Sequence, residues 1–331
     1  MAATAMLFAG ASYGPMVGAF AIIKDWRNSY YATVLYTSLT LIPIFLSTES
    51  PRTELRKGRR EAAEAGLARL AKLNKVQWTG NLNDSETAGE DQIKPEGFFT
   101  KVRSIFVHRV LFLETCCLAL MWQVVYLSYF GINYAWDNLV PDASIAFILS
   151  MVIQICSYSA FIVMVSRVGI RRYMMVSFLG AGVLFAVAIS GYPIGSGGWT
   201  VASIASILTC FLTGGAYCGV MMWTVEAAPA SHTGTVFGIC SMLAKVVGMA
   251  SPALFGTMTR MTGGNEAPFG VLSFLGLVSG VVAWWMVDTT GKPIAGTPLD
   301  VNTRRKAGRG NRGKKVDPVI HINVMAIETC D

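Results

Sequence analysis

Long uncharged, apolar runs alternate with short polar segments along most of the chain. A hydrocarbon core about 30 Å thick takes about 20 apolar residues of helix to cross, and these runs reach that length. Lipid offers no partner for backbone N–H and C=O groups, so each run should form a helix. The predicted fold class is therefore an all-α membrane protein. We predict eight spans, at about residues 3–23, 29–47, 111–132, 144–165, 173–192, 200–225, 236–258 and 269–287.

The composition agrees with a membrane protein. Hydrophobic residues make up 53% of the 331 residues and charged residues only 14%, whereas a soluble domain has about 25% charged residues. The seven cysteines lack metal-ligand spacing, so we interpret them as small core residues. The three histidines form no cluster, and no GxxxxGK phosphate loop occurs. We therefore expect no enzyme activity, no cofactor or metal, and no nucleic-acid partner.

The basic residues are distributed unevenly between the two sides of the predicted bundle. Of the 27 Lys and Arg residues, 23 fall in the segment from Arg52 to Arg109, in the turn at 166–172, or in the tail from Lys292. All three segments lie on one side if eight helices cross the membrane. Lys and Arg near the ends of spans stay cytoplasmic. The charge pattern thus predicts that both termini and the long central loop are cytoplasmic.

Outside the spans, residues 54–74 contain good helix formers and a partial apolar stripe of leucines, which predicts a helix lying along the membrane face. Residues 81–91 form an acidic linker, and residues 302–315 form a basic tail. Each basic residue of that tail could contribute about 1 kcal/mol of attraction to anionic lipid. The alternative is a solvated tail that only fixes the topology.

A series of motifs then resembles one family of transporters. The exit from span 29–47 and the exit from span 269–287 carry similar motifs, which suits a transporter built from repeated halves. Together with others they resemble the organic cation/anion/carnitine transporter family of the major facilitator superfamily. The motifs are Glu-Ser-Pro-Arg at 49–52, Ala-Lys-Leu-Asn at 71–74, Tyr-Phe-Gly at 129–131, Arg-Val-Gly-Ile-Arg-Arg at 167–172, Trp-Thr-Val-Glu-Ala-Ala-Pro at 223–229, Ser-Pro at 251–252 and Asp-Thr-Thr-Gly-Lys-Pro at 288–293.

The resemblance implies a domain organisation and places Met1 near the start of the family's fifth helix. Helices five to twelve are then expected, which would be a partial bundle without the first four. Residues 1–50 would hold the last two helices of an N-terminal bundle, and residues 51–108 a cytoplasmic central loop. Residues 109–288 would form a six-helix C-terminal bundle, followed by a basic cytoplasmic tail at 289–331. The plasma membrane is the expected location, with lipid around the chain and a homo-oligomer left open.

The resemblance also implies secondary transport of small organic ions by alternating access. Anionic or zwitterionic, carnitine-like substrates are slightly preferred over cations. Two alternatives stay open, a truncated membrane protein inactive in transport and a sugar porter of the same superfamily.

Lys245 is the outstanding polar residue because it lies near the middle of a span. A charge at that depth costs at least about 2.5–3.5 kcal/mol, so its side chain should face a polar cavity or a carboxylate. One interpretation is a contact for an anionic or zwitterionic substrate. The other is a structural ion pair with Glu226.

Aromatic and amide side chains supply the other candidate substrate contacts. Trp122, Tyr126, Tyr129 and Asn133 recur at the spacing of one helical face. Such a face can hold an organic cation by cation–π contact, or it can simply pack and anchor the helix. The resemblance favours a pathway role for the two tyrosines. The remaining candidates are Gln154 and Tyr158, which share a face, and Trp223, for which core packing is the alternative.

Charged residues near the ends of spans are the candidate gating residues. Glu226 could take part in gating or proton coupling, or form a latch at its helix end. Arg167, Arg171 and Arg172 crowd a short turn and suggest a latch between bundle halves. The resemblance adds Glu49 and Arg52 of the Glu-Ser-Pro-Arg motif.

Overall fold

A computed structural model describes residues 26–39, 54, 59–73, 97–139, 143–191, 193–194, 199–289 and 301. The chain divides into two compact units. One unit spans residues 22–97, and the other combines residues 1–21 with residues 98–331.

The smaller unit contains two described helices, α2 (Trp26–Leu39) and α5 (Arg60–Leu73). Helix α5 lies within the predicted membrane-face helix 54–74. Its first turn is supported by an ion pair between Arg60 Nε and Glu64 Oε1 at 3.3 Å. Helix α2 overlaps the start of the predicted span 29–47, whose remainder lies outside the described residues, as does the predicted span 3–23.

The larger unit contains six of the predicted spans. Within the described part of the chain, six helices are long and apolar enough to cross a membrane. They confirm the six predicted spans between residues 111 and 287. The all-α membrane fold is confirmed, and the described residues add only a short antiparallel hairpin of two-residue strands, β1 paired with β2. The elements are α7 (Phe98–Val107), α8 (Arg109–Leu139), α9 (Ala143–Val168), α10 (Ile170–Ala188), β1 (Pro193–Ile194), β2 (Trp199–Thr200), α11 (Val201–Ala227), α12 (Thr233–Thr262) and α13 (Glu266–Trp285).

Local sequence explains where several of these helices begin and end. Gly169 separates α9 from α10 with a φ of 85°, and Gly263 ends α12 with a φ of 76°. Glycine adopts positive φ without steric cost, so it suits both turns. Helix α11 begins at a capping box in which Thr200 and Ser203 exchange side-chain-to-backbone hydrogen bonds.

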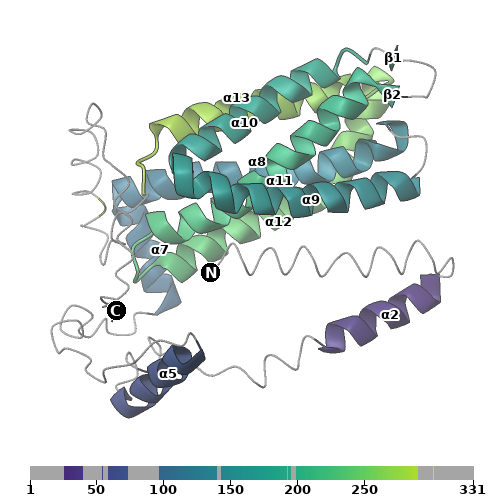
Figure 1. Ribbon diagram of the computed structural model, residues 1–331. Helices are drawn as coiled ribbons and strands as arrows, with labels where there is room; N and C mark the ends of the chain where they lie inside the picture. The colour runs from purple at the N-terminus through teal and green to yellow at the C-terminus, as the bar shows by residue number, and fades with distance from the viewer. Residues whose placement is uncertain are drawn as a thin grey trace. The chain divides into compact units, whose positions relative to one another are not determined.

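The six long helices pack side by side, with α8 in contact with α11, α12 and α13, while α10 packs against α11 and α13 (Figure 1). The hairpin lies at one end of this bundle. Helix α7 lies at the other end, which we call the α7 end, where α8 begins and α9 ends (Figure 1).

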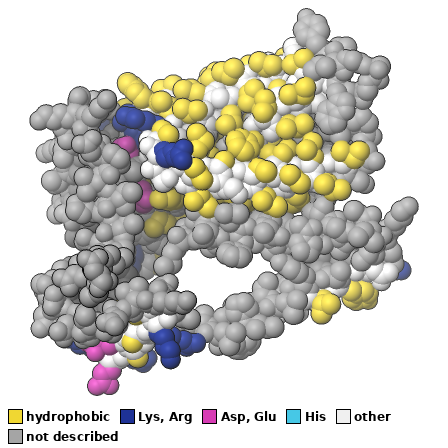
Figure 2. Space-filling model, viewed as in Figure 1, with side chains coloured by type: hydrophobic (Ala, Val, Ile, Leu, Met, Phe, Trp, Pro, Cys, Tyr) yellow, Lys and Arg dark blue, Asp and Glu magenta, His cyan; other side chains and the backbone are white. Residues whose placement is uncertain are grey.

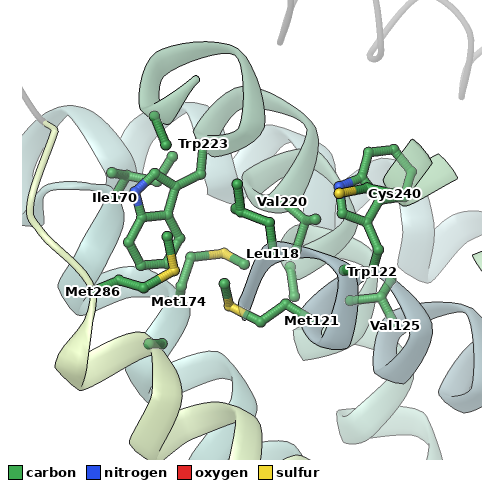
Figure 3. Packing of buried hydrophobic residues seen from close by; sticks show 14 of the residues in the cluster. Leu118, Met121, Trp122, Val125, Ile170, Met174, Val220, Trp223, Cys240 and Met286 are labelled. Atoms are coloured by element: carbon green, nitrogen blue, oxygen red, sulfur yellow. The ribbon is translucent and has the colours of Figure 1, made fainter. Parts of the chain in front are cut away.

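The core between these helices is rich in tryptophan and methionine. Trp223 is fully buried and points toward Ile170, Met174 and Met286 (Figure 3). Trp122 lies in the same cluster with Cys240 and Val125 beside it (Figure 3). These large side chains hold the helices together, because each aromatic residue buries about 150–250 Å² of its surface against its neighbours.

Helices α10 and α13 approach each other most closely at glycines. A Cβ added at Gly276 would lie 3.0 Å from the Cα of Gly182. The hydroxyl of Ser273 donates a hydrogen bond of 2.8 Å to the carbonyl of Gly182. Small residues that allow backbones to meet are a common device for packing helices in lipid.

The outer surface of the bundle is apolar. Val176, Val183, Phe274 and Val281 are all more than half exposed on α10 and α13. Figure 2 shows hydrophobic side chains spread over the visible face of the bundle, with Lys and Arg side chains gathered at one end. An apolar surface of this extent is costly in water and suits lipid.

Candidate functional site

Aromatic rings from three helices meet around Trp122 and Tyr126 of α8. The ring of Trp122 stacks on Tyr126 with centroids 6.2 Å apart. Trp122 also contacts Phe237 of α12, at 5.2 Å and nearly perpendicular, and Tyr217 of α11, edge-on at 6.3 Å. Tyr217 of α11 packs edge-on against Tyr126 at 5.9 Å, and Phe130 continues the row along α8. We call Trp122, Tyr126, Phe130, Tyr217 and Phe237 the aromatic cluster.

The base of the aromatic cluster is fixed by one hydrogen bond. Trp122 Nε1 donates to Thr224 Oγ1 at 2.9 Å, and both residues are buried. Tyr126 and Tyr217 are only half buried, and their rings pack edge-on against each other. The cluster therefore has a rigid buried base and an accessible rim that carries phenol hydroxyls.

Helix α9 brings Gln154 and Tyr158 to the same rim. Tyr158 Oη donates to Gln154 Oε1 at 3.4 Å, and the Tyr158 ring lies against α11, 3.9 Å from where a Cβ on Gly214 would be. Next to it, Ser157 donates a hydrogen bond to the carbonyl of Phe211 and ties α9 to α11. Tyr126 contacts Tyr217 of α11, and Tyr158, bonded to Gln154, packs against the same helix at Gly214, three residues before Tyr217.

Lys245 lies on α12, one turn from the place where that helix meets the aromatic cluster. Tyr126 and Phe130 cover Gly248, because a Cβ there would lie 2.8 Å from a Phe130 ring carbon and 3.4 Å from one of Tyr126. Lys245 precedes Gly248 by three residues, about 4.5 Å along the helix axis. Its side chain is exposed on the bundle surface. A lysine side chain is long enough for its ammonium group to reach the rim from there.

One backbone hydrogen bond of α12 is missing at Gly248, three residues after Lys245. Pro252 has no N–H, so the carbonyl of Gly248 loses its usual helical donor. The hydroxyl of Ser251 donates to that carbonyl at 2.7 Å instead. The Ser-Pro motif therefore keeps this carbonyl hydrogen-bonded at the level where α12 contacts the tyrosines.

The alternative ion pair between Lys245 and Glu226 is not formed. Glu226 lies in the last turn of α11, where Thr289 Oγ1 donates to its Oε2 at 2.5 Å. Lys245 is twelve residues into α12, about 18 Å from the start of that helix. No ion pair of Lys245 with another described residue is found. The structure therefore does not favour this alternative, because sequence distance alone does not show how far apart two points on neighbouring helices lie.

Two predicted contact residues lie away from the rim. Trp223 is fully buried against Met174 and Met286, a position that favours the packing alternative (Figure 3). Tyr129 is about two-fifths exposed and packs edge-on against Phe130 at 5.4 Å. Their contact with substrate stays a prediction.

The candidate gating residues gather at the α7 end. Arg171 donates a hydrogen bond to the carbonyl of Trp284, so it connects the start of α10 to the last turn of α13. Glu226 connects the end of α11 to Thr289, just beyond α13. Arg167 and Arg172 are exposed. Glu49 and Arg52 lie outside the described residues.

Two of the cysteines correct the interpretation of all of them as core residues. Cys116 on α8 and Cys156 on α9 are exposed, whereas Cys210, Cys218 and Cys240 are buried. In the described part of the chain, no group of His, Cys, Asp and Glu is arranged to hold a metal ion. Exposed cysteines carry little cost in this bundle because its outer surface suits lipid.

Sequence reasoning missed Tyr217, Phe237 and Thr224. All three lie in long apolar runs where nearly every residue is hydrophobic or small, so no single helical face stands out. The signal available was the Gly214–Gly215 pair just before Tyr217. Ser157 and Tyr173 pack closely over these glycines, and helices that come so near also bring their larger side chains together.

Comparisons with known proteins agree with the motif resemblance. The family model of the Major Facilitator Superfamily matches residues 2–252. An organic cation transporter-like protein from Drosophila melanogaster is 25% identical over 291 residues, which are 84% of this chain and 50% of that protein. Organic cation/carnitine transporter 4 from Arabidopsis thaliana is 22% identical over 93% of this chain and 58% of its own. These relatives confirm the similarity to organic cation and carnitine transporters.

The solved structure of the proton:xylose symporter XylE, bound to 6-bromo-6-deoxy-D-glucose, is similar in fold. The TM-score is 0.60 at 18% identity, over 81% of this chain and 57% of the symporter chain. This likeness shows the fold. The chain spans about half the length of the curated relatives it matches.

Proposed function

This chain belongs to the major facilitator superfamily, and we propose that it serves in secondary transport of small organic ions across a membrane. The observation that carries the proposal is the position of Lys245, one turn from the tyrosine-bearing rim of the aromatic cluster. Relatives named as organic cation and carnitine transporters support the same class of substrate.

The chemistry of the rim favours a zwitterionic or anionic substrate. An ammonium group at the depth of Lys245 gains a counter-ion when a substrate carboxylate binds it, which offsets part of the cost of holding charge within the membrane. The rings of Tyr126, Tyr217 and Tyr158 can contact a substituted ammonium group by cation–π attraction. Tyrosine hydroxyls and the Gln154 amide add hydrogen bonds that orient the bound molecule.

Transport would follow the alternating-access scheme of secondary transporters, in which one bundle rocks against another around a central site. Arg171 and Glu226 hold the last turn of α13 and its continuation at the α7 end. In this proposal the two tethers, with Glu49, Arg52, Arg167 and Arg172, stabilise one access state. Glu226 follows Tyr217 by nine residues on α11, about 13.5 Å along the helix axis, so its loss should alter turnover more than affinity.

The test is uptake of labelled carnitine, a small organic anion, a small organic cation and glucose by cells that express the protein. Lys245→Ala should lower uptake of carnitine and the anion by at least about tenfold, since a hydrogen bond to a charged group contributes about 1.5–3 kcal/mol. Lys245→Arg keeps the positive charge and should retain most of the uptake. Surface labelling checks that both variants reach the membrane.

Three results would contradict the proposal in different ways. Normal carnitine uptake by Lys245→Ala would reject the role of Lys245. Uptake of glucose alone would favour a sugar porter. No uptake of any of the four compounds, with normal surface labelling, would favour a membrane protein inactive in transport.

A further inference from the structure

Helix α7 presents an aromatic and basic stripe that the substrate site does not use. Phe99, Arg103 and Phe106 recur at i, i+4 and i+7 and therefore share one helical face. Phe99 is 85% exposed and Phe106 is 64% exposed, and Arg103 between them is exposed as well. Two large apolar rings flanking a cation on an exposed face are unusual on a surface that meets only water.

The opposite face of α7 is held against the bundle. Ile105 is buried in the same core cluster as Trp122 and Trp223, and α7 packs against both α8 and α12. On the stripe itself, the ring of Phe106 also contacts Phe112 of α8, with centroids 5.3 Å apart, while 64% of Phe106 stays exposed. The stripe therefore has a fixed direction relative to the membrane-crossing helices.

The bundle also fixes the depth of the stripe. The adjoining helix α8 is long and apolar enough to cross a membrane, and only the bend at His108 separates its first residue, Arg109, from α7. Figure 1 shows α7 running across the end of the bundle, transverse to the long helices. A helix in that position lies in the headgroup region, where amphipathic helices bury rings and keep their cations among the phosphates.

The basic residues of α7 and the start of α8 favour a negatively charged lipid surface. Between Phe98 and Leu113 the sequence contains Lys101, Arg103 and Arg109 and no Asp or Glu. Basic residues at this level are attracted to anionic headgroups. A zwitterionic headgroup offers no comparable net attraction.

We propose that the Phe99–Arg103–Phe106 stripe of α7 is a docking surface for anionic phospholipid, with the two rings among the acyl chains and Arg103 on a lipid phosphate. Lys101 and Arg109 add to the positive potential at the same level. The proposal rests on the six spans and on α7, and it holds whether or not the chain transports.

The test uses the complete chain in nanodiscs of phosphatidylcholine, alone or mixed with phosphatidylglycerol, and follows hydrogen–deuterium exchange of the amides of residues 98–107. Exchange should be slower by about fivefold or more in the anionic discs, the factor that corresponds to one cation near an anionic surface. Arg103→Gln should remove most of this difference. Arg260→Gln is the matched control, because Arg260 is also exposed and lies near the far end of α12.

A second variant separates the rings from the charge. Phe99→Ala should speed exchange in both kinds of disc, because it removes an apolar anchor that does not depend on headgroup charge. Equal exchange of α7 in the two lipid mixtures would overturn the proposal. Slow exchange already present in detergent would overturn it too, because the stripe would then be covered by protein.

Discussion

Thr224 connects two helices through a single buried hydroxyl. It accepts the hydrogen bond from Trp122 Nε1 and donates one of 2.7 Å to the carbonyl of Val220 in its own helix. Valine has nearly the same shape but no hydroxyl. Thr224→Val should leave the buried indole N–H without its acceptor, at a cost of about 1–3 kcal/mol. The measurement is the apparent melting temperature of the purified protein in detergent.

Thr209 on the same helix provides the control. It is equally buried, and its hydroxyl donates to the carbonyl of Ala205 within α11. Thr209→Val removes a hydrogen bond inside one helix and leaves no side chain of another helix without its partner. It should therefore lower the melting temperature clearly less than Thr224→Val does. Equal losses for the two variants would mean that the bond to Trp122 contributes little.

Single residues differ in how far the sequence reveals them. Lys245 was found because a charge in an apolar run stands out from its neighbours. Its surroundings were only half predicted, since the proposed partner Glu226 lies at the end of another helix and contacts Thr289. For Tyr217 the hydrophobic pattern gave no signal, because residues on every side of this part of α11 are apolar or small, and only the neighbouring Gly214–Gly215 pair pointed to a close helix contact. Periodicity identifies a face only where polar and apolar residues alternate.

Among the helices, the α10–α13 pair tests how closely two backbones need to meet. A Cβ at Gly276 would lie 3.0 and 3.1 Å from Gly182 backbone atoms and 3.3 Å from the carbonyl oxygen of Phe178. Backbone cannot move aside as a side chain can. Gly276→Ala should therefore separate the two helices and cost about 1–3 kcal/mol, seen as a lower melting temperature.

Gly270 is the matched position, since it lies on the same helix and a Cβ there would meet nothing within 4 Å. Gly270→Ala should leave the melting temperature unchanged or raise it, because alanine favours helix more than glycine does. A loss as large as that of Gly276→Ala would show that general helix changes, and not the contact with α10, control stability.

Whole helices were easier to predict from the sequence than their partners. The six spans are recognisable because lipid imposes a length and forbids charge, and these constraints act on each segment alone. Helix α7 was missed because ten residues of mixed polarity resemble any connecting segment. The hairpin was missed because two-residue strands carry no period. The contacts between helices, including the one between Gly182 and Gly276, involve two distant segments and so cannot be predicted from the pattern of either segment alone.

At the scale of the whole molecule, charge and span number together determine orientation. In the described bundle, the basic residues near helix ends are Lys101, Arg103, Arg109, Arg167, Arg171 and Arg172 at the α7 end and Arg260 at the hairpin end. Basic residues flanking spans remain on the cytoplasmic side. The expectation is therefore that the α7 end is cytoplasmic and the hairpin end is not.

Short epitope tags in two turns test this orientation. One tag follows Ala230, in the turn between α11 and α12, and the other follows Gly264, in the turn between α12 and α13. A single span separates the turns, so the tags should report opposite compartments. In cells that carry the protein at their surface, antibody should reach the Gly264 tag directly and the Ala230 tag only after permeabilisation. Tags that report the same compartment would remove α12 as a span, and the reverse order would mean that the basic end faces outward. The same-compartment result would also deprive Lys245 of its place midway across the membrane, on which the proposed recognition of a substrate anion depends, whereas the reverse order would leave that place unchanged.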